Sequence, residues 1–251
     1  MKIATWNVNG IRAREAQLCD WLERDRPDIV CLQELKATPE QVPARCAHAD
    51  YHVYWHGMRA YSGVSLHVSR HLQAEAPAFS HPAFDMESRI VQVTLGNLVL
   101  ASVYVPNGGK DYRAKLEFLT NLARWTNELH ASGRDVVICG DLNVARTDID
   151  VHPRERKPGV IGQRSEEREL FDRLLDGHSI DVGRAAQPEN AELFTWWPPW
   201  RNMRQRNIGW RIDYILASKP IADRVTECVV LADIGTSDHA PVMMTTSGSE
   251  Q

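Results

Sequence analysis

The sequence has few cysteines, and none of them is placed for a metal cluster or a redox motif. The five cysteines are odd in number and scattered, most lie in apolar runs, and no two have C-x-x-C spacing. This distribution predicts reduced cysteines in the core.

Long hydrophobic runs and an excess of basic residues are also missing. The longest strongly apolar run, at 98–105, is far too short to span a bilayer, and Met1 is followed directly by a strand-like stretch instead of a basic leader. The formal net charge of −4 does not by itself indicate a nucleic-acid binder. We therefore expect a cytoplasmic protein with no membrane partner.

The chain shows no linker, short-period repeat or low-complexity tract. With 251 residues, 43% of them hydrophobic and 25% charged, it has the composition of an ordinary soluble globular protein. We expect a single domain over 1–246 and a flexible C-terminal tail over 247–251.

Short strand patterns alternate with helical ones. Strands are expected at 2–8, 28–33, 51–55, 63–69, 89–95, 98–105, 135–140, 212–217, 224–231 and 241–246, and helices at 12–25, 39–48, 111–131 and 165–176. Several adjacent strands are separated only by turns, which argues against an all-parallel doubly wound sheet. The pattern predicts an α/β fold, a four-layered sandwich of two mixed β-sheets packed face to face with helices outside.

Polar residues stand where the apolar strands end. They are Asn7, Glu34, Asp141, Asn143 and Asp213, joined near the C-terminus by the adjacent pair Asp238 and His239 in "TSDHAP". A buried carboxylate is costly unless it is paired or bound to metal, so any one of these could be a structural ion pair, whereas the whole set indicates a site. Oxygen and amide ligands favour Mg²⁺ or Mn²⁺ over zinc, and such ions commonly complete their shell with substrate phosphate.

A second feature is the segment from Leu193 to Ile212. It contains four arginines interleaved with four tryptophans and no acidic residue. Such a segment can form a positive, aromatic surface for nucleic acid, or the tryptophans can pack a corner of the core.

Seven blocks of sequence together resemble one known family. "KIATWNVNGIR", "DIVCLQELK", "YSGVSL", "VYVPNGG", "VICGDLNVA", "GWRIDYIL" and "TSDHAP" occur in the order typical of the exonuclease III family of apurinic/apyrimidinic endonucleases, within the endonuclease/exonuclease/phosphatase superfamily. The resemblance runs from Lys2 to about Val242. A lone "GDLN" or "SDH" would be shared by many phosphoesterases.

The resemblance implies roles for the strand-end residues. It implies a Mg²⁺ site (Mn²⁺ is possible) made by Glu34, Asn7 and Asp238, and a catalytic set of Tyr104, Asp141, Asn143, Asp213 and His239. Asp141 would orient or deprotonate the attacking water, and Asn143 would hold the water or the phosphate. His239, fixed by Asp213, would donate to a phosphate oxygen. Tyr104 would face the phosphate or leaving group as a phenolate or as a donor, although a tyrosine in an apolar strand is usually a core residue.

The resemblance also implies contacts to duplex DNA. Phosphate contacts fall on Lys36, Tyr61, Arg89, Asn107 and Lys110; Trp197 and Trp210 would wall the abasic pocket, with Trp196, Trp200 and Arg201 near the strand. An aromatic pocket can accept an abasic sugar and exclude an intact base. For an isolated Lys or Arg, a solvated surface is the default reading.

One segment departs from the family pattern. In the loop at 146–168, Gly162, Glu167 and Arg168 survive, but Gln163 and Ser165 replace the usual Phe and Pro. The loop asparagines are missing, and we expect Arg154, Arg156 and Lys157 to contact phosphates in their place.

The sequence thus predicts a monomeric, Mg²⁺-dependent DNA repair nuclease that incises 5′ to abasic sites and trims 3′ ends. The alternatives are a member specialised for 3′ ends or uracil-containing DNA, a noncatalytic DNA-binding homologue, and a phosphatase of lipids or small molecules.

Overall fold

The computed structural model describes residues 1–176 and 178–248 and shows two six-stranded sheets. The strands of the first sheet, in spatial order, are β11 (Val225–Val230), β12 (Val242–Thr246), β1 (Lys2–Asn7), β2 (Ile29–Gln33), β4 (Tyr61–Ser69) and β3 (Tyr51–Met58). Those of the second are β5 (Phe79–Ser80), β6 (Ile90–Leu95), β7 (Leu98–Tyr104), β8 (Asp135–Asp141), β10 (Asp213–Ser218) and β9 (Ser179–Asp181). Both sheets are mixed, because β1–β2 and β7–β8 are parallel and the other named pairs are antiparallel.

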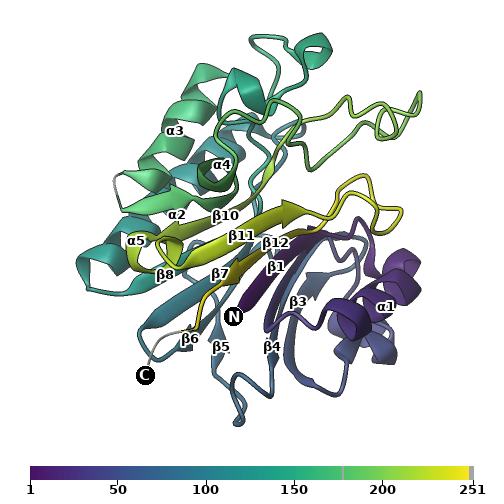
Figure 1. The fold of residues 1–251 in the computed structure, drawn as a ribbon, viewed down its shortest axis with the longest axis vertical. Coiled ribbons are helices and arrows are strands. Elements are labelled where there is room, and N and C mark those ends of the chain that lie inside the picture. The colour runs from purple at the N-terminus through teal and green to yellow at the C-terminus, as the bar shows by residue number, and fades with distance from the viewer. Residues whose placement is uncertain (177, 249–251) are drawn as a thin grey trace.

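The sheets pack face to face with helices on their outer faces, which confirms the four-layered α/β sandwich (Figure 1). One core cluster lies between the sheets and includes Ile3, Leu66 and Val137. The outer face of the first sheet is covered by α1 (Glu15–Asp25), and that of the second by α2 (Tyr112–Ala131) and α3 (Ser165–Leu175). The central strands are therefore apolar on both faces, as their continuous hydrophobic runs predict.

Each of the ten expected strands forms, with bounds that differ by at most three residues at either end. The structure adds the short strands β5 and β9 and the short helices α4 (Val182–Ala186) and α5 (Lys219–Ala222). Three of the expected helices also form, and α2 begins after Asp111, whose carboxylate accepts a hydrogen bond from the amide of Ala114.

The helix expected at 39–48 is wrong. Two 3₁₀ turns, Pro39–Gln41 and Ala44–Ala47, stand in its place. Pro43 lies between them, and Val42 before it is extended, with ψ at 129°. Proline lacks the amide hydrogen and disfavours a helical residue before it, so a continuous helix cannot pass this point.

The two ends of the described chain lie together. β1 pairs with β12, and the amino group of Met1 donates to the carbonyl of Thr246 at 3.1 Å. In the tail expected to be flexible, the Ser247 amide donates to Arg224, whereas 249–251 lie outside the described residues. Of the helices that the structure describes, none combines the length and the apolar character needed to cross a membrane.

Candidate active site

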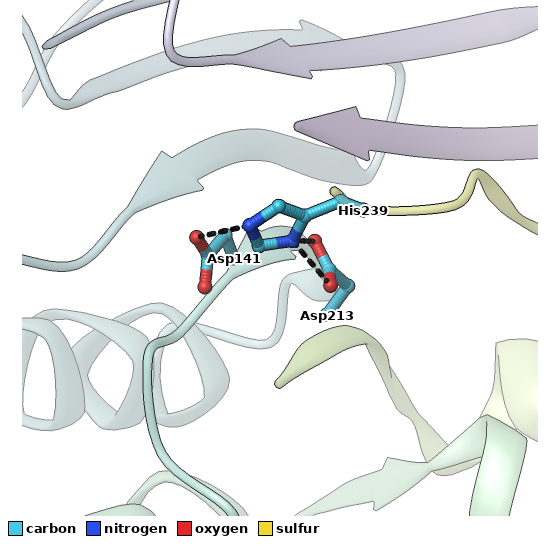
Figure 2. A group of neighbouring side chains, drawn as sticks. All are labelled: Asp141, Asp213 and His239. Atoms are coloured by element: carbon cyan, nitrogen blue, oxygen red, sulfur yellow. Dashed lines mark hydrogen bonds and ion pairs between the residues drawn. The ribbon is translucent and has the colours of Figure 1, made fainter. Parts of the chain in front are cut away.

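The strand ends that carry the candidate residues meet at one end of the packed sheets. Asn7 ends β1, and Tyr104 and Asp141 stand opposite each other at the ends of the parallel strands β7 and β8. β10 runs antiparallel to β8, so its first residue, Asp213, faces Asp141. The loop before β12 brings His239 between these two aspartates (Figure 2).

His239 is held by Asp213 in one orientation. Its Nδ1 lies 2.9 Å from Oδ2 and 3.2 Å from Oδ1 of that carboxylate, and both residues are buried. Burial alone would lower the pKa of His239, but the charges of Asp213 and Asp141 outweigh it and raise the pKa to about 10. The ring is therefore an imidazolium at neutral pH, with Nε2 directed toward Asp141 at 3.8 Å, beyond hydrogen-bond reach.

Asp141 is a buried carboxylate whose two oxygens are oriented by amides. Nδ2 of Asn7 donates to Oδ2 at 2.9 Å, and the backbone amide of Asn143 donates to Oδ1 at 2.9 Å. Asn143 has a left-handed backbone (φ 52°), which turns the chain back toward the carboxylate. Burial raises the pKa of Asp141 to about 7, against the opposing charge of His239. This is the range suited to a general base.

Glu34 forms the second half of the site, immediately after β2. The hydroxyl of Tyr104 donates to its Oε1, and Nζ of Lys36 lies 2.8 Å from its Oε2. Burial would raise the pKa of Glu34, but these two partners lower it, so the carboxylate is charged. Burial and the Glu34 charge hold the pKa of Tyr104 well above its usual value. This direction favours the donor over the phenolate, and the choice between the two stays a prediction.

Asn9 is a site residue that the sequence analysis missed. Its Oδ1 accepts from Lys36, and its Nδ2 donates to Oδ1 of Asp238 at 2.7 Å. Oδ2 of Asp238 accepts from the indole of Trp196 at 3.0 Å. In "WNVNG" an asparagine before glycine is most simply a turn residue, and its φ of 44° fits that reading too, so nothing local distinguishes it.

The charge of the site fits a divalent cation. Within the described site, four carboxylates, those of Glu34, Asp141, Asp213 and Asp238, face two cationic side chains, Lys36 and His239. Donor atoms of Asp141, Asp213 and His239 lie within 4.8 Å of one another, but the imidazolium is committed to Asp213 and is a poor ligand. The oxygens of Glu34, with Asn7 and Asp238 nearby in the network, are the better candidates for a hard ion.

A cavity of about 660 Å³ opens beside Glu34 and Tyr104. Its walls include all five residues expected to contact DNA phosphates: Lys36, Tyr61, Arg89, Asn107 and Lys110. Tyr61 is 43% exposed and Lys110 is exposed, whereas Arg89 is only 2% exposed. Four of the five are thus accessible as expected, and Arg89 is not.

Comparison with known proteins agrees with this geometry. The model of the Endonuclease/Exonuclease/phosphatase family matches residues 4–239. The chain belongs to the endonuclease/exonuclease/phosphatase family.

Individual members of the endonuclease/exonuclease/phosphatase family resemble nearly the whole chain. An exodeoxyribonuclease of Bacillus subtilis is 34% identical over 96% of this chain and 98% of its own. An AP endonuclease from Archaeoglobus fulgidus is 29% identical, with a TM-score of 0.86, over 99% of this chain and 100% of its own. The 3′ phosphatase NExo from Neisseria, bound to a product DNA hairpin, is 32% identical with a TM-score of 0.88 over the same shares.

In this family member the tryptophan-rich segment, 193–212, places some aromatic side chains near the site and others in the core. The rings of Trp196 and Trp210 meet edge to face at 5.6 Å, and Trp196 lies 6.4 Å from the His239 ring. Trp200 is 58% exposed and Arg201 is exposed, in the segment that loops outward between α4 and β10 (Figure 1).

Trp197, expected to wall the abasic pocket, is largely enclosed by its neighbours, and its place in that pocket stays a prediction. Trp197 is 2% exposed and packs in an apolar cluster with Phe194 and Met203. Its indole donates to Oδ1 of Asn207 at 3.0 Å, and the guanidinium of Arg204 lies 4.9 Å from its ring. Adjacent tryptophans in an extended segment point to opposite sides, so Trp196 and Trp197 have different surroundings.

The divergent loop at 146–168 is anchored at both ends. Asp150 pairs with Arg211 and Arg184, each at 2.7 Å. Gly162 has a φ of +93°, and a Cβ there would lie 2.9 Å from the Trp210 ring, so this family member needs glycine at the position. Its three expected phosphate contacts, Arg154, Arg156 and Lys157, are all accessible to solvent.

Proposed function

We propose that this protein is a divalent-metal-dependent nuclease that hydrolyses phosphodiester bonds in duplex DNA, incising 5′ to abasic sites and trimming 3′ ends. The observation that carries the proposal is the His239 imidazolium, held by Asp213 and pointing at Asp141 beside Glu34. The names of its relatives, an exodeoxyribonuclease and an AP endonuclease, support the same reaction class.

Asp141 is placed to orient a water molecule and take its proton. Asn7 and Asn143 fix its carboxylate, so the lone pairs have a set direction. Burial raises its pKa to about 7, which makes it a stronger base than an ordinary aspartate.

His239 is placed to stabilise charge on the phosphate. Attack on a phosphodiester adds negative charge to its nonbridging oxygens, and the Nε2 proton is a fixed cationic donor for one of them. Asp213 accepts the Nδ1 proton and so fixes the ring orientation that directs the Nε2 proton into the site. The Tyr104 hydroxyl, on the Glu34 side, is a neutral donor for the phosphate or the leaving oxygen.

We propose Mg²⁺ as the cofactor, with Mn²⁺ as a substitute, held by Glu34 together with Asn7 and Asp238. When bound, such an ion stabilises the developing negative charge and acidifies water. The surplus of carboxylates over cationic groups at the site supports this assignment.

The aromatic groups support an abasic substrate. Trp196 lies next to His239, and Trp210 packs against Trp196, so these rings offer an aromatic wall for a sugar that lacks its base. The exposed Trp200 and Arg201 can reach the flanking strand.

A member specialised for 3′ ends is the second candidate. The divergent loop favours it, because this loop lacks the expected asparagines and presents Arg154, Arg156 and Lys157 instead. Resemblance to the 3′ phosphatase NExo favours it as well. This candidate would use the same catalytic groups. It differs in the substrate that fits the site, a 3′ end instead of an internal abasic position.

The test is a cleavage panel with the purified protein. We expect Mg²⁺-dependent cutting of a duplex with a tetrahydrofuran abasic analogue, no cutting in EDTA, and kcat lower by roughly 10³-fold or more in Asp141→Asn or His239→Ala. Asp172→Asn, in an exposed pair with Arg146, and His71→Ala, on an exposed turn, are the matched controls.

The same panel separates the two candidates. Recessed 3′ ends, a 3′-phosphate and a uracil-containing duplex are compared with the abasic duplex by kcat/KM. Preference for the 3′ substrates by about 100-fold or more would select the specialised enzyme. Full activity of Asp141→Asn or His239→Ala would show that the catalytic roles are misassigned.

We further propose that the protein acts as a monomer in the cytoplasm. Its five cysteines are all buried and unbridged, which agrees with a reducing compartment. Light scattering on the purified protein, with and without DNA, tests the monomer.

A further inference from the structure

Arg89 lines the cavity beside the site, yet each nitrogen of its guanidinium already has a protein partner, Nη1 being 3.5 Å from the Tyr104 carbonyl. The residue is 2% exposed. Its Nε and Nη2 donate to Oε2 of Glu87 at 3.1 and 2.9 Å, and Nη2 also donates to the Tyr61 hydroxyl at 3.0 Å. A DNA phosphate would therefore compete with Glu87 and Tyr61 for this guanidinium.

The same guanidinium is built against Tyr104. Its Cζ lies 4.7 Å from the centre of the Tyr104 ring, within the range of a cation–π contact. The two backbones are also joined, because the amide of Tyr104 donates to the carbonyl of Arg89 at 2.8 Å. The far end of the Tyr104 ring carries the hydroxyl that donates to Glu34. Arg89 therefore packs against the face of the Tyr104 ring, while the hydroxyl at the tip of that ring reaches Glu34.

The exposed side chain of Tyr61 packs over the buried guanidinium of Arg89. Its ring lies 5.3 Å from the Arg89 Cζ, and Nζ of Lys110 lies 5.9 Å from the same ring. Lys110 is exposed, and the Lys36 side chain is 40% exposed. The cavity thus has an exposed Lys110, a partly exposed Lys36 that pairs with Glu34, and a buried Arg89.

We propose that Arg89 is a positioning residue for Tyr104 and does not bind a DNA phosphate. Glu87 and Tyr61 hold the guanidinium in the plane that supports the Tyr104 ring. This inference rests on the proposed function for the step in which Tyr104 acts, but the absence of a phosphate contact does not depend on it.

The first experiment measures how DNA binding depends on salt. Each lysine or arginine that neutralises a phosphate adds about 0.9 to the slope of log K against log salt concentration. Binding of the abasic-analogue duplex is measured in EDTA, by fluorescence anisotropy, for the wild type, Arg89→Met and Lys110→Met. We expect the slope to fall by about 0.9 in Lys110→Met and to remain that of the wild type in Arg89→Met.

The second experiment measures turnover. Loss of support for Tyr104 should lower kcat roughly 10- to 100-fold in Arg89→Met with KM little changed. Arg89→Lys should lose nearly as much, since an ammonium cannot form the forked contacts to Glu87 and Tyr61, whereas a lysine would largely preserve a phosphate contact. In a Tyr104→Phe background, Arg89→Met should cost much less than it does alone.

The outcomes are distinct. A slope lower by about 0.9 in Arg89→Met, or an unchanged kcat in that variant, overturns the proposal. If Arg89→Met does not fold by thermal melting, Arg89→Lys decides: low kcat with the wild-type slope supports the proposal, and normal kcat overturns it. If the wild type cuts no substrate, the proposed function fails, while the salt slopes still decide whether Arg89 binds DNA.

Discussion

Two buried histidines show how surroundings set the charge of one side chain type. His239 faces Asp213 and Asp141, which outweigh burial and raise its pKa to about 10. His67, in the middle of β4, faces the Cys46 carbonyl at 3.3 Å, and no carboxylate of the described chain acts on its pKa. Burial there lowers the pKa to about 4. One ring is a fixed cation and the other is neutral.

His67 should make folding stability fall in mild acid. Between pH 6.5 and 4 the unfolded chain binds a proton on His67 that the folded protein does not, so the free energy of unfolding falls as pH falls. The loss should reach about 3 kcal/mol across this window, because each tenfold difference in proton affinity between the folded and unfolded chain is worth roughly 1.4 kcal/mol. Urea unfolding of the wild type and His67→Gln between pH 7 and pH 4 measures it as a difference, because Asp141, whose pKa is raised, also takes up a proton in this range.

The control for this prediction removes the ring. His67→Gln should gain stability relative to the wild type as pH falls from 6.5 to 4, by about the His67 contribution, whereas His71→Gln, at an exposed position, should keep the wild-type dependence. Equal dependence in the wild type and His67→Gln would show that His67 is not the group responsible.

Residue types alone separated site from core only in part. The sequence singled out Asp213 and His239, because charged residues next to apolar strands need partners. It could not show that Trp197 turns inward and Trp196 outward, or that Arg89 lies under Tyr61. Those outcomes depend on which strand or loop covers the side chain, and the covering segment can be distant in the sequence.

The helices α2 and α3 are joined by an ion pair that the sequence analysis did not find. Lys115 and Glu167 are both 0% exposed and paired. Nζ of Lys115 also donates to the carbonyl of Asn143 at 2.7 Å, and Glu167 accepts from the Gly162 amide at 2.7 Å. Two helices on the outside of the sheet thereby hold the loop that orients Asp141.

Removing both partners of this pair should restore much of the stability that is lost on removing one, but should not restore activity. Lys115→Met leaves a buried, unpaired carboxylate and should lower the free energy of unfolding by about 3–5 kcal/mol. Lys115→Met with Glu167→Met should regain much of that loss, since no charge is left unpaired. We expect kcat to stay at least roughly 10-fold low in both, because the Asn143 carbonyl has lost its donor.

Urea unfolding and kcat, measured on the same preparations, decide this prediction. Recovery of both stability and kcat in the double variant would show that the pair only supports the fold. Lys219→Met, in an exposed pair with Asp223, is the control and should change neither quantity by much.

Long elements were predictable and short ones were not. The ten strands and three of four helices follow from apolar patterns of sufficient length and from residues such as Asp111 at a helix start. β5 and β9 have two and three residues, too few to show a period. They exist because a neighbouring strand supplies hydrogen-bond partners, which local sequence cannot reveal. At 39–48 the apolar pattern predicts a helix, but Pro43 interrupts it and two 3₁₀ turns form.

The groups of the candidate site come from both sheets, so neither sheet alone contains the site. Asn7 and Glu34 belong to the first sheet, Asp141 and Asp213 to the second, and Asn7 bonds directly to Asp141 across the interface. The core between the sheets therefore sets the distances within the site.

Activity and structure should be lost together on unfolding. We expect the urea dependence of tryptophan fluorescence, of far-ultraviolet circular dichroism and of residual cleavage activity to give one midpoint, since separation of the sheets removes the site and the core at once. Loss of activity at a clearly lower urea concentration would show that the strand ends loosen before the sheets part.

The pairing of β1 with β12 also bears on the synthesis of the protein. A ribosome that has completed β10 has supplied Asn7, Glu34, Asp141 and Asp213, but His239 comes only with the last strand. Nascent or prematurely terminated chains therefore lack the cationic donor. The candidate site is therefore assembled only once β12 has paired with β1.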